Sequence, residues 1–206
     1  MKQVIVDYIG SIEISPAQIN ESLANNGGKL IVSGVLQRGS TTNEKNFNQN
    51  GRSYPLPILK RESEKYKKTL VQERRALGEL DHPESQVVNL ANVSHNILDL
   101  WWQGNDLMGK IEILSTPSGN IAKELLKSGI RLGISSRGMG SVKELGEGKV
   151  EVEDDFEIVC WDLVSNPSTQ GAFVAPSLNE GVKQPIQNNH YNKINSLINE
   201  IITIMQ

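Results

Sequence analysis

The chain has 206 residues, 37% of them hydrophobic and 22% charged, with a formal net charge of −3. This composition excludes a disordered or collagen-like chain, and without a basic surplus we expect no nucleic-acid partner. The single cysteine, Cys160, excludes an intrachain disulfide and a thiolate zinc cluster. Apolar runs fall short of the ~20 residues of a membrane span, and Asp7 comes too early for a signal-peptide core. We therefore expect one soluble domain of a reducing compartment, with or without a tail.

Patterns in the first third of the chain predict two strands and two helices around a polar loop. β-branched runs indicate strands at 4–9 and 29–36, and the Ser-Pro pair at 15–16 suits a helix start. The Asn-, Thr- and Gly-rich stretch 37–53 is typical of a surface loop. A proline pair then favours a helix over 55–68.

Strand patterns dominate from residue 76 onward. The predicted strands are 76–80, 94–102, 107–114, 130–136, 140–145, 149–153 and 156–165. The second and third of these flank a four-residue turn and should pair as a hairpin. A helix is expected between Thr116 and Gly129, with an apolar face formed by Ile121, Ala122, Leu125 and Leu126. The expected fold class is α+β: a mostly antiparallel, barrel-like sheet, closed or nearly closed, with a few surrounding helices.

Composition divides the chain into a domain, a linker and a tail. The domain is expected over residues 1–176, and the polar, Pro- and Gly-containing stretch 177–191 is typical of a flexible linker. Residues 192–206 predict an amphipathic helix, because their apolar residues recur at helical spacing.

The turn Gly78-Glu79-Leu80-Asp81-His82-Pro83 offers a candidate general base. A histidine at a strand end, beside a proline that fixes the turn, has a defined backbone and an accessible ring. A surface histidine in an ordinary turn is the more common explanation of such a pattern. His82 alone therefore decides nothing.

The segment 133–140 places Ser135 and Ser136 between glycines. Glycines let backbone amides approach a substrate, so the amides near Arg137 and Gly138 could form an oxyanion hole beside a nucleophilic serine. The structural alternative is a Gly/Ser-rich strand with a bulge. Arg137 is either a solvated side chain or a cation that orients a water or the substrate backbone.

The segment 156–164 places a carboxylate in an apolar strand. Strand alternation puts Asp162 on one face with Phe156, Ile158, Cys160 and Val164, where a charge needs a partner. An imidazole N–H is one such partner and would complete a nucleophile–base–orienter triad, whereas a backbone cap or an arginine is the structural alternative. Cys160 as nucleophile is disfavoured, because it lies in a hydrophobic strand with no base nearby in sequence.

Other clusters favour structural roles. Trp101 and Trp102 indicate hairpin packing, with a carbohydrate-stacking platform as the alternative. Three carboxylates around the predicted hairpin, namely Asp99, Asp106 and Glu112, are expected to be solvated rather than to form a metal site or a catalytic pair. His95 is interpreted as structural.

Five segments together resemble one family. They are Asn48-Gln49-Asn50-Gly51-Arg52-Ser53-Tyr54-Pro55, Gly78-Glu79-Leu80-Asp81-His82-Pro83, Trp101-Trp102-Gln103-Gly104-Asn105-Asp106, Gly133-Ile134-Ser135-Ser136-Arg137-Gly138-Met139-Gly140-Ser141, and Asp162-Leu163-Val164 leading to Asn166-Pro167-Ser168. In this order, over about residues 30–176, they resemble the prohead core (assembly) serine proteases of tailed bacteriophages, which are related in fold to the herpesvirus assembly proteases.

The resemblance implies a Ser/His/Asp-type endopeptidase that needs no metal or organic cofactor. By motif position His82 is the base, Ser135 the nucleophile and Asp162 the third member. The spacing to glycine in the herpesvirus enzymes selects Ser136 instead, and the third member varies among relatives. A catalytically inactive scaffold or shell protein of the same fold is the alternative function.

The resemblance also implies substrates and a location. Relatives cleave scaffold or core proteins, capsid proteins and themselves after a glutamate that has an aliphatic residue two positions before it. Such triplets end here at Glu21, Glu180 and Glu200, and we expect self-cleavage after Glu180 in the linker. The expected location is the procapsid interior in the host cytoplasm, with no membrane partner. Whether the chain forms a homo-oligomer is not decided by its sequence, although the herpesvirus relatives are dimers.

Overall fold

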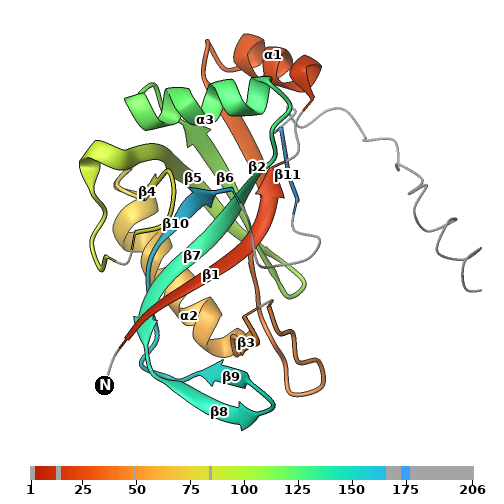
Figure 1. Cartoon of the computed structure of the whole chain (residues 1–206), viewed down its shortest axis with the longest axis vertical. Helices are drawn as coiled ribbons and strands as arrows, with labels where there is room; N and C mark the ends of the chain where they lie inside the picture. Colours follow the sequence, from red (N-terminus) through yellow and green to blue (C-terminus); the bar gives the residue numbers. More distant parts are fainter. Residues whose placement is uncertain (1–2, 13–14, 49, 84, 166–172, 177–206) are drawn as a thin grey trace, which may run out of the picture.

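The computed structural model describes residues 3–12, 15–48, 50–83, 85–165 and 173–176. An eight-stranded sheet has the order β10-β7-β1-β11-β2-β6-β5-β4, and a small sheet, β3-β9-β8, lies at one end (Figure 1). The large sheet consists of β1 (Gln3–Ile12), β2 (Leu30–Arg38), β4 (Leu77–Glu79), β5 (Val93–Gln103), β6 (Asp106–Ile113), β7 (Leu132–Gly140), β10 (Glu157–Val164) and β11 (Phe173–Pro176). The small sheet consists of β3 (Arg52–Ser53), β8 (Val142–Gly146) and β9 (Lys149–Val152). Apart from the parallel pairs β1–β11 and β3–β9, neighbouring strands are antiparallel, so the α+β class with a mostly antiparallel sheet is confirmed.

The large sheet curls until its edge strands, β4 and β10, meet. An isolated parallel bridge joins Leu80 to Leu163, and the Asp81 N–H donates to the Leu163 carbonyl at 2.7 Å. We call this meeting point the seam. Within the described residues no ladder continues along it, because β4 has only three residues to offer. The sheet is therefore not a closed barrel, and the seam brings the residue after Asp81 beside the C-terminal part of β10.

Local sequence signals explain where the helices begin. They are α1 (Pro16–Asn25), α2 (Leu56–Tyr66), which continues into the π-helical turn η1 (Lys67–Val71), α3 (Pro117–Lys127) and the 3₁₀ turn η2 (Leu90–Asn92). A capping box between Ser15 and Gln18 begins α1, and the Thr116 side chain accepts the Gly119 N–H at the start of α3. Figure 1 shows α1 and α3 together at one end of the molecule and the β8–β9 hairpin at the other.

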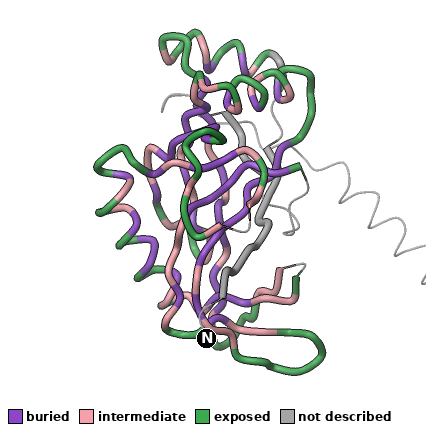
Figure 2. The backbone as a smooth tube through the Cα atoms, turned by 60° about the vertical axis from the view of Figure 1, so that its left-hand side comes forward, coloured by how far each residue is buried: buried purple, intermediate pink, exposed green. Residues whose placement is uncertain are grey.

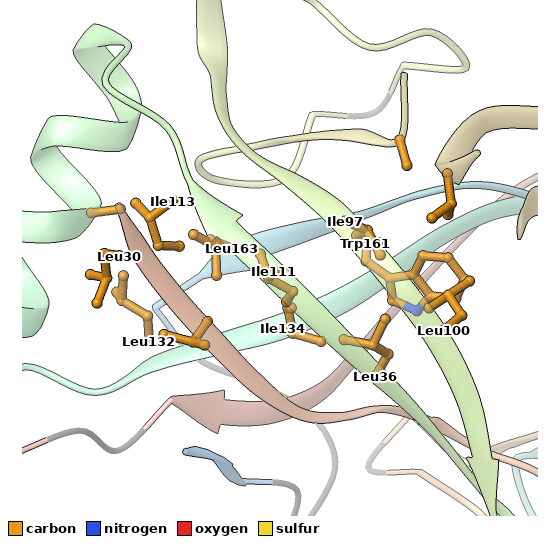
Figure 3. Close-up of a cluster of buried hydrophobic side chains, with 14 of the residues drawn as sticks. Leu30, Leu36, Ile97, Leu100, Ile111, Ile113, Leu132, Ile134, Trp161 and Leu163 are labelled. Carbon is orange, nitrogen blue, oxygen red and sulfur yellow. The ribbon is translucent and has the colours of Figure 1, made fainter. Parts of the chain in front are cut away.

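The main core fills the inside of the curled sheet. Figure 3 shows Ile111, Ile134, Trp161 and Leu163 converging from three strands, and each is fully buried. Tyr66 of α2 packs edge-on against Trp161, with ring centroids 5.0 Å apart. Burying each such side chain contributes roughly 1.5–3 kcal/mol to folding. Figure 2 shows the same concentration of buried residues along the strands, so this layer fixes β7 and β10 relative to one another.

Two sequence-based expectations are wrong in detail. Ile121 is 54% exposed, because α3 packs through a narrower stripe that includes Ala122 and Leu126. The stretch 37–53 is not simply a surface loop, since Ser40 and Ser53 are buried and joined by a 2.8 Å hydrogen bond between their hydroxyls. The expected linker and C-terminal helix lie outside the described residues.

A substitution at Gly78 tests how closely β4 packs against β10. A Cβ at this position would lie 2.1 Å from the Trp161 carbonyl oxygen and 2.3 Å from the His95 Nε2 atom. Because one obstacle is backbone, we expect Gly78→Ala to lower the free energy of unfolding by about 3 kcal/mol in denaturant titrations. The control Gly104→Ala has open space around it and a φ of +61°, so it should cost about 1 kcal/mol. Equal losses in the two variants would contradict the close approach of β4 to β10.

Candidate active site

Strand register places a serine opposite a carboxylate. Ser135 of β7 pairs directly with Asp162 of β10, while the neighbouring Ile134, Trp161 and Leu163 point into the core. Because side chains alternate along a strand, Ser135 and Asp162 face away from the core, toward β4 and the segment that follows it. The polar pair is therefore built by the same register that builds the core.

A β-bulge changes which residues share a strand face with Asp162, so part of the prediction for this face is wrong. The pairing register shifts between Ile158 and Cys160, which leaves Val159 as an extra residue in β10. Phe156 and Ile158 consequently pack with the core clusters, on the face opposite Asp162. Cys160 keeps the expected phase with Asp162. Strict alternation from sequence could not have found this switch.

The seam brings His82 to the carboxylate. Asp81 adopts a left-handed φ of +68°, and its side chain accepts the His82 backbone N–H at 2.9 Å. Asp and Asn tolerate this conformation better than most residues because their side chains bond locally. The turn directs the imidazole at Asp162: His82 Nδ1 lies 2.8 Å from Asp162 Oδ2.

The third contact completes a chain of hydrogen bonds. The Ser135 Oγ lies 3.2 Å from His82 Nε2. Ser135 and Asp162 are fully buried, and the His82 side chain is 3% exposed. The structure thus brings together the three residues expected from the sequence. Ser135 and His82 are 53 positions apart along the chain, and His82 and Asp162 are 80 positions apart.

Ser136 occupies a different environment. Its residue is 1% exposed on the core face of β7, and its hydroxyl makes no hydrogen bond within the described part of the chain. Being one residue along the strand, it points away from His82. The geometry therefore favours Ser135 of the two hydroxyls that the sequence left open.

Asp162 stays ionised despite its burial. Burial alone would raise its pKa, but the hydrogen bonds from His82 and from the Glu79 backbone N–H, with the charge of Arg137, hold the pKa below its ordinary value. An ionised carboxylate only accepts hydrogen bonds. The His82 Nδ1 must therefore carry a proton, and in the neutral imidazole Nε2 is the acceptor that faces the Ser135 hydroxyl.

Arg137 is not a solvated side chain, so that sequence-based expectation is wrong. It is fully buried, and its five N–H donors face protein acceptors. Those acceptors are Asp162, Glu79, the Cys160 sulfur and the carbonyls of Ser85 and Val87. Burial opposes its charge, yet these neighbours raise its pKa above the ordinary value.

Strand pairing argues against the expected oxyanion hole near Arg137 and Gly138. Over this segment β7 lies between β1 and β10, with registered partners on both sides. Backbone N–H groups of a central strand point along the sheet at the neighbouring strands, not at side chains above it. Donors for an oxyanion have to come from elements other than β7.

The other candidate groups have structural surroundings. Trp101 and Trp102 are consecutive in β5 and point to opposite sides, so they do not form one stacking platform. The carboxylates of the hairpin pair with cations: Asp99 with Lys67, Asp106 with Arg38, and Glu112 with Lys29 and Arg74. His95 is fully buried between Ser94 and the Trp161 carbonyl, and burial lowers its pKa to about 4. Among the described residues no helix has the length and apolar character to cross a membrane.

Comparison with known proteins places this site in a family. The sequence model described as "Prohead core protein serine protease" matches residues 6–183. The chain belongs to this family. It is 32% identical over 151 residues to the prohead core protein protease of Enterobacteria phage T4, covering 71% of this chain and 68% of that protein. It also resembles the structure of the bacteriophage T4 capsid assembly protease, with a TM-score of 0.66 and 24% identity over 81% of this chain and 99% of that one.

The family assignment confirms the resemblance read from the five segments and makes the chain a peptidase of phage capsid assembly. The structural match supports the same fold. Two features of the site were not predicted from the sequence. They are the buried Glu79–Arg137 pair and the contacts of segment 85–89. Glu79 gave no signal, because nothing local to it indicates burial.

Cys160 provides a test of the site's chemistry. Burial, and after it the negative charge of Asp162, raise the pKa of this thiol well above its ordinary value. Because only the thiolate alkylates readily, we expect native protein at pH 8 to react with iodoacetamide at least about a hundredfold more slowly than unfolded protein. Mass spectrometry of alkylated Cys160 measures both rates. Rapid native modification that abolishes activity would revive Cys160 as the nucleophile.

Proposed function

We propose that this protein is a serine endopeptidase of the phage procapsid, in which Ser135 is the nucleophile, His82 the general base and Asp162 the orienting carboxylate. The observation that carries the proposal is the continuous path from Ser135 Oγ to His82 Nε2 at 3.2 Å and from His82 Nδ1 to Asp162 Oδ2 at 2.8 Å. Nucleophile–base–orienter geometry of this kind is recognised by contacts and roles, not by sequence position.

The mechanism follows from the tautomer. His82 Nε2 takes the hydroxyl proton as Ser135 Oγ attacks the scissile carbonyl carbon, and the carbonyl π electrons move to oxygen. The imidazolium that forms carries its positive charge beside ionised Asp162. It then donates the Nε2 proton to the leaving amine, which departs and leaves an acyl-enzyme. Water, deprotonated by the same nitrogen, releases the acid and restores Ser135.

The proposed substrates are the phage core or scaffold proteins, the capsid proteins and this chain itself, each cut after glutamate. Substrates of this kind are consistent with the family to which the chain belongs. Arg137 does not provide the cation for a substrate glutamate, because its donors already face protein acceptors. We further propose that residues 1–176 form the protease domain and that 177–191 link it to a helix at 192–206.

Burial discriminates between two of the candidate self-cleavage positions. Glu21 lies in the middle of α1, and Ile19, two residues before it, is fully buried. A helical segment must unwind before it can enter a protease site, which costs several ordered residues. Glu180, in the polar stretch after the domain, faces no such requirement from its sequence. We therefore favour Glu180.

Adjacent serines give a matched test of the nucleophile. We expect Ser135→Ala to lower kcat by at least about a thousandfold on a peptide spanning residues 174–186, because the attacking oxygen is removed. Ser136→Ala removes a buried hydroxyl without a hydrogen bond, so its activity should stay within twofold of wild type and its stability should be unchanged or higher. Steady-state kinetics and thermal unfolding measure both. Loss of activity in Ser136→Ala alone would move the nucleophile to Ser136, and full activity in both variants would favour the inactive-scaffold alternative.

Self-cleavage is tested on the full chain. Protein incubated at high concentration should lose residues 181–206, and Glu180→Gln should block this step by removing the charge expected to be recognised. Glu21→Gln is the matched control and should be processed like wild type. Intact mass spectrometry over time follows the products. A chain that cleaves the peptide but keeps its own C-terminus, or a Glu180→Gln variant that is processed normally, would contradict the proposed position.

A further inference from the structure

Arg137 lies behind the pair formed by His82 and Asp162. It leaves β7 two residues after Ser135, on the same side of the strand. Its Nε lies 3.0 Å from Asp162 Oδ2, the oxygen that also faces His82, and its Nη2 lies 3.1 Å from Oδ1. The Nη2 hydrogen bond to Oδ1 and the close ionic approach of Nε to Oδ2 hold both oxygens of the carboxylate. The orientation of Asp162 toward His82 is thus set from behind.

Glu79 holds the other side of the guanidinium. Its Oε1 lies 2.8 Å from Arg137 Nη2 and accepts the Asn89 backbone N–H at 2.9 Å. Arg137 Nη1 donates to the Ser85 carbonyl at 2.9 Å. One ion pair therefore ties β4, β7 and β10 to segment 85–89, which follows His82 along the chain. His82 is held from both ends: by the seam before it and by these contacts after it.

We propose that the Arg137–Glu79 ion pair is a positioning device for the general base, holding Asp162 in register with His82 and anchoring the segment after His82 against the sheet. The proposal rests on the proposed function of His82 as base. Arg137 and Glu79 are positioning residues, since every contact they make is with protein groups and none is with the reacting Ser135 hydroxyl in the described hydrogen bonds.

The charges of this group make the proposal testable. Two carboxylates and one guanidinium surround the imidazole, so the group carries one net negative charge and becomes neutral when His82 gains a proton. Besides His82, Glu79 and Arg137, the titratable groups described as interacting electrostatically with Asp162 are uncharged at neutral pH. They are the Cys160 thiol and the Tyr66 phenol, whose pKa values burial raises, and His95, whose pKa burial lowers to about 4. Asp81, on the histidine's own turn, is exposed to solvent.

Removing Arg137 and removing Glu79 therefore change the protonation of His82 in opposite directions. Without Arg137 two carboxylates act unopposed on the imidazole and favour its proton. Without the charge of Glu79 the remaining guanidinium and carboxylate sum to zero instead of −1, so the proton on the imidazole is less favoured. A residue that merely stabilises the fold would lower the unfolding free energy in both variants, and it would not move the acid limb of the pH profile with opposite signs.

The experiment measures kcat, KM and the pH dependence of kcat/KM for the full chain acting on the peptide 174–186. Arg137→Met should lower kcat by about tenfold to a hundredfold with KM within about twofold, because the base is misplaced. It should move the acid limb up by about one pH unit, and Glu79→Gln should move it down by a comparable amount. Arg137→Lys keeps the charge but not the planar fork, so kcat should fall while the acid limb stays near that of wild type.

Matched substitutions at remote ion pairs provide the controls. Arg38→Met breaks the two-point contact with Asp106, and Glu112→Gln weakens the pair with Lys29, and both should keep wild-type kcat and acid limb. If Arg137→Met does not fold, Arg137→Lys and Glu79→Gln decide the matter. Acid limbs that stay within about 0.2 pH units of wild type, or that move in the same direction, would overturn the proposal. Ser135→Ala distinguishes failure of the proposed function from failure of the positioning role. Activity that survives in Ser135→Ala refutes the proposed function. An inactive Ser135→Ala, together with unshifted acid limbs in the Arg137 and Glu79 variants, refutes only the positioning role.

Discussion

A negative charge buried without compensation is the constraint on which this site depends. Asp162 is completely buried, yet it stays ionised because the Glu79 backbone N–H, the Arg137 guanidinium and the His82 ring all direct N–H groups at it. An unpaired carboxylate in such a place would cost several kcal/mol or would take up a proton. A protonated Asp162 would no longer hold the Nδ1 tautomer of His82, so the partners of the carboxylate are also conditions for the proposed chemistry.

The curled sheet is what allows these partners to meet. β4 is short, and its main function in the fold is to carry the chain across the seam to β10, where the left-handed turn at Asp81 aims His82 inward. The core behind β7 and β10 fixes the register that sets Ser135 opposite Asp162. The same packing leaves Ser135 fully buried.

Much of this could be predicted from sequence, and the failures have physical causes. Strand alternation and turn chemistry located the hairpin of β5 and β6 and the first half of β7, because both signals are local. The predicted strand ended at residue 136, whereas β7 continues to Gly140. The family motifs pointed to His82, Ser135 and Asp162, which the fold brings within hydrogen-bond reach. The bulge at Val159 escaped prediction, since one inserted residue changes the face of every residue before it without altering composition. The environment of Arg137 escaped it too, because whether a guanidinium is solvated or buried depends on Glu79, 58 residues away.

The proton on the His82 ring tests the account most directly. Nitrogen-15 NMR of histidine-labelled protein near neutral pH distinguishes the two neutral tautomers and reports the proton between the ring and Asp162. We expect His82 to carry its proton on Nδ1, with a low-field proton signal that disappears in Asp162→Asn while the signals of His95 persist. A neutral His82 with its proton on Nε2, or one whose spectrum does not respond to Asp162→Asn, would contradict the view that the buried carboxylate prepares this histidine to act as a base.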